Sequence, residues 1–273
     1  SMTLTSCACK YSDFDTDWYS DAEAALKIRE IFSYHSASEF DFVNRKFWEW
    51  CVITRALKER GKLKNGATGL GCAVGTEPLT AFFANLGVKV LATDIVTEDA
   101  GGWIATNEHC ADREALFFNA LCGRATFQKN VAFQPMDMRQ LDGLEGRFDF
   151  IWSSCALEHL GSLDAGLDYI FSSSEYLAEG GVAVHTTEFN VSSNTSTIEH
   201  GSAVVYRKAD IQELEEDLAR RGFKLVDPDF DAGRHKYDLD YDVAPYMVNG
   251  KPHVKLDIGG YVCTSYLLII ERL

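Results

Sequence analysis

The chain has 273 residues, of which 46% are hydrophobic and 25% charged, a composition typical of a globular protein with a substantial core. Its net charge of −15 argues against a general nucleic-acid-binding protein, because contacts to phosphates need a basic surface. No apolar run approaches the roughly 18–20 residues of a membrane helix, and no signal peptide is evident. The eight cysteines include no CxxC pair, which favours free thiols over disulfides. We therefore expect a cytoplasmic protein with no nucleic-acid or membrane partner.

The first part of the chain has a helical pattern. Apolar residues recur at spacings of three and four over 21–32 and again over 42–63, which predicts amphipathic helices. The aromatic side chains Trp48 and Trp50 are expected to pack on the core. We expect residues 1–63 to form a helical cap or lid.

From residue 64 the pattern changes to strands that alternate with helices. Strands are expected at 67–71, 89–95, 131–138, 148–155, 181–189, 224–230 and 261–272. Helices are expected at 77–87, 112–123, 163–181 and 208–223.

This alternation indicates an α/β fold with a doubly wound, mainly parallel seven-stranded sheet that is covered on both faces. The last two strands are joined by an irregular segment, 227–259, and not by a helix, so the last strand can be antiparallel. We expect one domain over 64–273, with 227–259 as an insertion loop.

A glycine-rich turn follows the first of these strands. Its glycines are Gly69, Gly71 and Gly75, whereas the dinucleotide pattern GxGxxG requires a glycine where this chain has Val74. Asp94 ends the second strand, and a carboxylate there can accept hydrogen bonds from both hydroxyls of a ribose, each contributing roughly 1.5–3 kcal/mol. The turn and the acid together predict a nucleoside-like ligand rather than a pyrophosphate.

Polar residues also follow the third and fourth strands. Asp137 and Met138 end the third, where an acid beside an apolar side chain can bind an adenine amino group and cover the ring. Ser154, Glu158 and His159 follow the fourth. Since the carboxyl ends of parallel strands meet at one edge of the sheet, we expect these residues to face the same cleft.

The order of these motifs resembles that of the Rossmann-like (class I) S-adenosylmethionine-dependent methyltransferases. The likeness covers roughly residues 64–190 by motif, and the last strand pair extends it to the end. It implies that Asp94 binds the ribose of S-adenosylmethionine, that Asp137 and Met138 contact its adenine, and that Ser154 belongs to the strand-four motif beside the cofactor.

The glycine turn departs from the family motif, which is acid-x-Gly-x-Gly-x-Gly. The leading acid is missing, and Ala73 replaces the middle glycine. Gly69, Gly71 and Gly75 are still expected to lie against the cofactor. Glu77, just downstream, is the expected substitute acid for the methionine amino group.

A narrower likeness concerns the acceptor. The segments 44–50, 69–79 and 184–190 resemble bacterial methyltransferases that occur beside sugar and glycosyltransferase genes. This likeness implies a small-molecule acceptor, a carbohydrate or another hydroxylated metabolite. Nothing in the sequence specifies the oligomeric state.

Methyl transfer from a sulfonium is an in-line displacement in which the cofactor supplies the methyl group. A hydroxyl acceptor also needs a base, whereas an amine often needs only to be neutral. His159 is the candidate base, with a structural or cofactor contact as the alternative. Glu188, at the end of the fifth strand, is a candidate for binding the acceptor or for base catalysis, and His185 in that strand is expected to pack in the core.

No metal is expected. His185, Glu188, His200 and the aspartates of 227–259 offer oxygen and nitrogen ligands, but no HxxxH or DxDxDG spacing is present. A solvated acidic loop is the favoured interpretation of 227–259.

Two other functions remain open at this point. The glycine turn and Asp94 permit a nicotinamide-dependent oxidoreductase, although Val74 disfavours it. The altered turn also permits a protein that binds S-adenosylmethionine without catalysis. Trp103, after the second strand, could line either ligand or belong to the core.

Overall fold

The computed structural model describes residues 3–33, 40–95 and 112–273; Trp103 lies outside them. The strands are β1 (Cys7–Ala8), β2 (Thr68–Gly71), β3 (Lys89–Asp94), β4 (Val131–Pro135), β5 (Phe148–Ser154), β6 (Gly161–Ser162), β7 (Leu177–Asn190), β8 (His200–Gly201), β9 (Phe223–Leu225), β10 (Leu256–Ile258) and β11 (Tyr261–Arg272). The α-helices are α1 (Asp17–Ala25), α2 (Ile28–Ile31), α3 (Arg45–Glu59), α4 (Leu79–Asn85), α6 (Arg124–Asn130), α7 (Leu163–Ser174), α8 (Lys208–Arg220) and α9 (Lys236–Leu239). Short 3-10 helices are η1 (Tyr11–Asp15), η4 (Arg113–Leu116) and η5 (Leu157–His159).

The central sheet confirms the predicted α/β fold class. Its strand order is β1-β11-β7-β5-β2-β3-β4, and β9 and β10 also pair with β11. Strands β4, β3, β2, β5 and β7 are adjacent in this order and run parallel to one another. Strand β11 is antiparallel to β7. Seven of these strands are the expected ones, and the short strands β1 and β10 are additions to β11.

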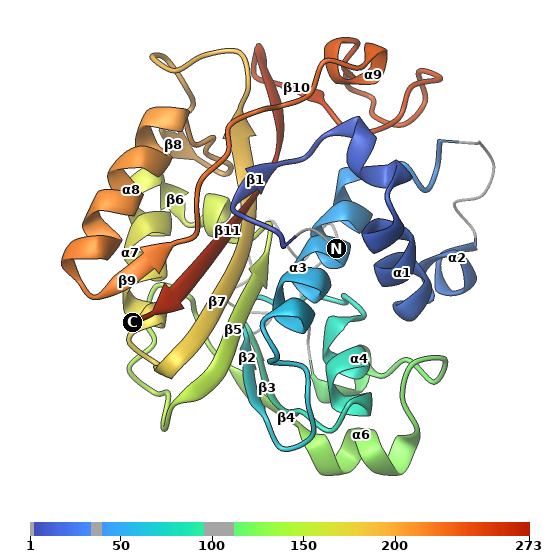
Figure 1. Cartoon of the computed structure of the whole chain (residues 1–273), viewed down its shortest axis with the longest axis vertical. Coiled ribbons are helices and arrows are strands. Elements are labelled where there is room, and N and C mark those ends of the chain that lie inside the picture. Colours follow the sequence, from blue (N-terminus) through green and yellow to red (C-terminus); the bar gives the residue numbers. More distant parts are fainter. Residues whose placement is uncertain (1–2, 34–39, 96–111) are drawn as a thin grey trace.

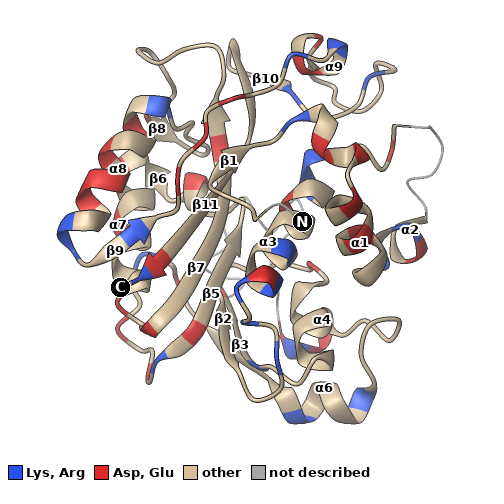
Figure 2. Cartoon of the chain, viewed as in Figure 1, with Lys and Arg blue, Asp and Glu red and all other residues tan. Residues whose placement is uncertain are grey.

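Helices cover both faces of this sheet, with α3, α4 and α6 on one side and α7 and α8 on the other (Figure 1). Each layer buries its own hydrophobic cluster against the sheet. Helix α8 shows why: Ile211, Leu214 and Leu218 are buried, and its outer face carries acidic side chains (Figure 2). The carboxyl ends of the parallel strands therefore meet at one edge between the two helical layers, where ligands bind in folds of this type.

Two glycines of the sheet make room for aromatic rings of the neighbouring strand. In the parallel register, Gly69 pairs with Phe150 and Gly71 with Trp152. A Cβ atom on either glycine would lie 2.5 Å from the ring of that partner. Core side chains of β5 thus occupy the space that a Cβ atom would need at these two glycines, where we expected the cofactor.

Two helix predictions were wrong in their limits. The expected helix at 112–123 is only the turn η4, and the following helix α6 was missed. The expected helix at 163–181 ends at Ser174, because Leu177 already pairs with Phe148 and begins β7. In both places tertiary pairing overrides local helical periodicity.

A buried ion pair within the 227–259 segment also contacts the N-terminal residues. Lys255 Nζ lies 2.8 Å from Asp238 Oδ1, and neither side chain is more than 2% exposed. The ammonium also donates to the Cys9 carbonyl at 2.7 Å, and the Tyr11 amide donates to Asp238 at 2.9 Å. Part of 227–259 is therefore buried and packed on the N-terminal residues, whereas we expected a solvated loop.

Candidate active site

The turn between β2 and α4 is held by the acid at the end of β3. Asp94 is 2% exposed, and its Oδ2 accepts a hydrogen bond of 2.9 Å from the Gly75 amide. Ala73 and Gly75 both have left-handed backbones, with φ of 52° and 54°. Ala73 therefore keeps the conformation that glycine adopts most easily, although it replaces the expected middle glycine. The turn and Asp94 therefore form one structural unit, and the contact of Asp94 with a ribose stays a prediction.

Glu77 lies inside the same region and is buried. The indole Nε1 of Trp152 donates to its Oε1 at 2.5 Å. Burial raises the pKa of Glu77 from 4.5 to about 8, against the hydrogen bond from Trp152, which lowers it. A buried carboxyl in this state would gain from an ammonium beside it, because the opposite charge favours the ionised form. This chemistry suits the expected partner of the methionine amino group, which remains a prediction.

We expect the substitution Glu77→Gln to flatten the dependence of stability on pH. Between about pH 4.5 and about pH 8 the folded chain holds a proton on Glu77 that the unfolded chain releases. The free energy of unfolding therefore falls as the pH rises through this window. The variant keeps an oxygen that accepts from Trp152 but has no such proton. Over this pH window its free energy of unfolding should therefore fall by up to roughly a few kcal/mol less than that of the wild type. Urea unfolding of both proteins at the two ends of the window measures these free energies. An equal change with pH in the variant and the wild type would contradict the prediction.

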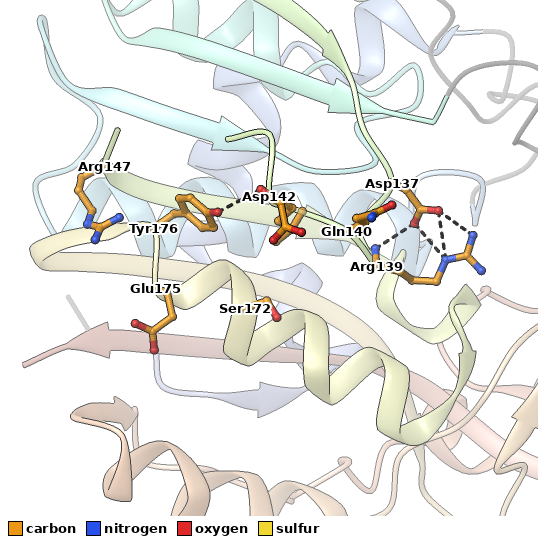
Figure 3. Close-up of a pocket in the computed structure, with 9 residues that line it drawn as sticks. Asp137, Arg139, Gln140, Asp142, Arg147, Ser172, Glu175 and Tyr176 are labelled. Atoms are coloured by element: carbon orange, nitrogen blue, oxygen red, sulfur yellow. Dashed lines mark hydrogen bonds and ion pairs between the residues drawn. The ribbon is translucent and has the colours of Figure 1, made fainter. Parts of the chain in front are cut away.

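The residues expected at the adenine lie at the end of β4. The Asp137 carboxylate accepts from the guanidinium of Arg139, with Nη2 at 2.8 Å, and these hydrogen bonds lower the pKa of Asp137. Both residues lie at one end of a pocket between this loop and α7, with Tyr176 and Arg147 toward the other end (Figure 3). Met138 is buried in the hydrophobic cluster on the α7 side. Their contact with adenine stays a prediction.

His159 lies on η5, shortly after β5, with one hydrogen-bond acceptor and one carboxyl group close to its ring. Its Nδ1 is 2.8 Å from the Ser202 carbonyl oxygen, and its Nε2 is 3.9 Å from Glu158 Oε2. A carbonyl only accepts hydrogen bonds, so Nδ1 carries the proton and the neutral ring has its lone pair on Nε2. Glu158 is itself buried and accepts from the Thr187 hydroxyl at 3.0 Å.

Glu188 is paired with an arginine from the N-terminal helix. Its Oε1 accepts from Arg45 Nη1, and Arg45 Nη1 also lies 3.3 Å from the Ser265 hydroxyl. Strand alternation puts Glu188 and Thr186 on the face covered by α3, and His185 and Thr187 on the other.

A second residue of α3 completes this group. Glu49 is 3% exposed, and its Oε2 accepts from the Thr186 hydroxyl at 2.9 Å. Burial raises the pKa of Glu49 to about 7, although Arg45 lowers it. The thiol of Cys155 lies 3.8 Å from Glu188 Oε1, between the ends of β5 and β7.

Sequence reasoning missed Arg45, Glu49 and Cys155. Arg45 and Glu49 are spaced i, i+4 on α3, so they lie on one face of the helix, and Glu49 is buried. Charged residues at helical spacing on an otherwise apolar face were the available signal. Cys155 has a left-handed backbone with φ of 47°, which no sequence pattern indicates.

His185 lies in the core, on the α7 side of the sheet. It is completely buried between the Ser153 hydroxyl, 2.7 Å from Nδ1, and the ring of Tyr169. Burial lowers its pKa to about 3, so the ring is neutral. Ser154, the last residue of β5, pairs with Thr186 and is partly exposed at the edge where the site lies.

The fold defines a Rossmann-like protein whose candidate site lies at the carboxyl ends of its parallel strands. The model of a family described as "Methyltransferase domain" matches residues 51–227. The chain belongs to this family and is an S-adenosylmethionine-dependent methyltransferase. The family match thus confirms the resemblance and favours it over a nicotinamide-dependent oxidoreductase.

Solved structures of several methyltransferases resemble the chain at low identity. An S-adenosylmethionine-dependent methyltransferase from Mesorhizobium loti is 13% identical, with a TM-score of 0.49 over 80% of this chain and 96% of that one. Magnesium protoporphyrin IX methyltransferase from Synechocystis is 14% identical, with a TM-score of 0.48 over 96% and 97%. A 1,6-didemethyltoxoflavin-N1-methyltransferase from Burkholderia thailandensis is 15% identical, with a TM-score of 0.47 over 100% and 92%. No curated protein matches the sequence.

Among the described residues, no helix is both long enough and apolar enough to span a membrane.

Proposed function

We propose that the protein transfers the methyl group of S-adenosylmethionine to a hydroxyl group of a small molecule, a carbohydrate or another hydroxylated metabolite. The observation that carries this proposal is the arrangement at His159. The Ser202 carbonyl fixes the proton on Nδ1, and the Glu158 carboxyl lies beside Nε2. An imidazole held in this way can accept the proton that a hydroxyl acceptor must lose.

The cofactor is proposed to lie over the β2–α4 turn. Asp94 would accept from the ribose hydroxyls and Glu77 would take the methionine ammonium. The backbone of Gly69, Gly71 and Gly75, together with Ser154, would line the same edge. Asp137 and Met138 would lie at the adenine, with Asp137 exchanging its contacts to Arg139.

The N-terminal residues 1–63 are proposed to act as a cap on the acceptor side of 64–273. Helix α3 supports this role, because Arg45 and Glu49 reach from it to the carboxyl end of β7. Glu188 would bind the acceptor in this region. A cytoplasmic location is proposed as well, supported by the seven described cysteines, all of which are free thiols.

A panel assay tests the choice of acceptor. Formation of S-adenosylhomocysteine is measured with hydroxylated carbohydrates and with amines of similar size. Turnover of at least one hydroxylated compound is expected. Turnover of amines alone would overturn the proposal, and cofactor binding without turnover of any acceptor would favour the non-catalytic alternative.

Replacing His159 with alanine is expected to lower kcat by about 10²–10⁴-fold, because the acceptor proton loses its base. The affinity for S-adenosylhomocysteine should stay unchanged. His200→Ala is the matched control, since His200 is an exposed histidine on the neighbouring strand β8. Steady-state kinetics of the two variants decide the matter: an unchanged kcat for His159→Ala would make His159 a structural contact.

A further inference from the structure

We propose that Cys155, Glu158 and Glu188 form a binding site for a divalent cation of the zinc class. One ligand atom from each residue lies within 4.8 Å of the other two. The thiol of Cys155 and Oε1 of Glu188 are 3.8 Å apart. Thiolate sulfur and carboxylate oxygen are both ligands that zinc accepts, and a single ion can bridge groups at these separations.

The charge of this region supports a cation with two positive charges. Glu49, Glu158 and Glu188 are each at most 3% exposed. Arg45 contributes one positive charge, and His159, 3.9 Å from Glu158, is counted as neutral. The three carboxylates, when ionised, therefore leave two negative charges that the guanidinium does not offset. An unbalanced buried charge is costly, and either protons or a cation must compensate it. A divalent ion offsets these two charges, and the Cys155 thiolate formed on binding would add one negative charge to the cluster.

One oxygen of the cluster also lacks a partner. Among the described residues, Oε2 of Glu188 is buried and accepts no hydrogen bond. It belongs to the same carboxylate whose Oε1 contacts Arg45 and the Cys155 thiol. A buried acceptor of this kind costs about 1–3 kcal/mol unless something binds it. A cation at the cluster would use this oxygen.

The geometry also suits an ion better than a larger ligand. Glu158 and Glu188 are almost fully buried, while Cys155 is partly exposed. The left-handed backbone of Cys155, with φ of 47°, is a strained conformation of the kind that collects at functional sites. On binding, the thiol would release its proton to solvent and bind as thiolate.

Three protein ligands leave one position of a tetrahedral ion open. An acceptor hydroxyl bound there would lose its proton more easily. This use rests on the proposed function, whereas binding of the ion does not. The sequence did not predict the site because Cys155 and Glu158, three residues apart after β5, meet Glu188 only through the pairing of β5 with β7.

The test uses the full-length chain, freed of metal with a chelator and titrated calorimetrically with Zn²⁺. Co²⁺ is added in a parallel experiment, because a thiolate ligand gives it a charge-transfer absorption band. One tight equivalent is expected for the wild type. Glu158→Gln and Cys155→Ser should bind at least about tenfold more weakly, and Cys155→Ser should lose the absorption band. Cys7→Ser is the matched control, another partly exposed thiol, and should bind as the wild type does.

Circular dichroism establishes that each variant is folded, and Glu158→Gln alone decides the question if Cys155→Ser does not fold. Absence of tight binding by the wild type would overturn the site, as would equal binding by Glu158→Gln. Tight binding that depends on these residues, with no hydroxylated acceptor turned over, would keep the site and refute the proposed function instead.

Discussion

Replacing Asp94 with alanine is expected to lower the affinity for S-adenosylhomocysteine by about a hundredfold or more. The variant loses the carboxylate proposed to accept from the ribose, where each charged hydrogen bond contributes roughly 1.5–3 kcal/mol. It also loses the acceptor that holds the Gly75 amide at 2.9 Å, so the turn itself would be less well ordered. Two losses at one residue make this the largest expected effect on binding.

Isothermal titration calorimetry measures this affinity. Asp149→Ala is a suitable control, because Asp149 also accepts from a backbone amide beside β2, that of Thr68 at 2.8 Å. It lies at the opposite end of the strands, where no ligand is proposed. The control should bind normally. Affinity of Asp94→Ala within about threefold of the wild type would refute the ribose assignment.

Replacing Lys255 with methionine is expected to cost about 3–5 kcal/mol of stability, the usual loss when one partner of a buried ion pair is removed. Asp238 would remain buried without its ammonium, and the Cys9 carbonyl would lose its donor. The 227–259 segment and the N-terminal residues would then lose their strongest polar link. This is the largest effect on stability that we expect from a single substitution.

Urea unfolding gives the free energy directly. Lys251→Met is the matched control, because it removes the lysine of an exposed ion pair in the same segment. Lys251 lies 2.8 Å from Asp240, and both side chains are at least 30% exposed. It should cost less than about 1 kcal/mol. Adding Asp238→Asn to Lys255→Met should recover part of the loss, since no uncompensated charge then remains. Equal costs for Lys255→Met and Lys251→Met would contradict the role of burial.

The fold could be predicted from local patterns because each strand and helix has its own periodicity. The change from helical to alternating segments near residue 64, and the absence of a long helical pattern between 227 and 259, were enough for the sheet and its antiparallel strand. The limits of α7 could not be predicted, because Leu177 pairs with Phe148, far away in the sequence. Periodicity contains no information about such a partner.

The candidate site divides in the same way. The location of Asp94 at the end of β3 and of Glu77 in the turn after β2 could be predicted from the chain, whereas their contacts with a ligand stay predictions. The roles of Gly69 and Gly71 were predicted from the ligand alone, whereas the structure shows the rings of β5 packed against them. Arg45 and Glu49 could not be placed, because their meeting with β7 depends on how α3 packs across the sheet.

The position of β11 in the sheet has a consequence for biosynthesis. This strand pairs with β7, β9, β10 and β1, and it is the last of them in sequence. During translation, β7 and β1 can pair with β11 only after β11 has been synthesised. More than 250 residues separate Cys7 from its partner Leu267. Pairing over such a separation is slow and leaves an open strand edge in the nascent chain. Because Arg45 also contacts Ser265 of β11, we expect the Arg45–Glu188 contact to become ordered only after β11 has left the ribosome.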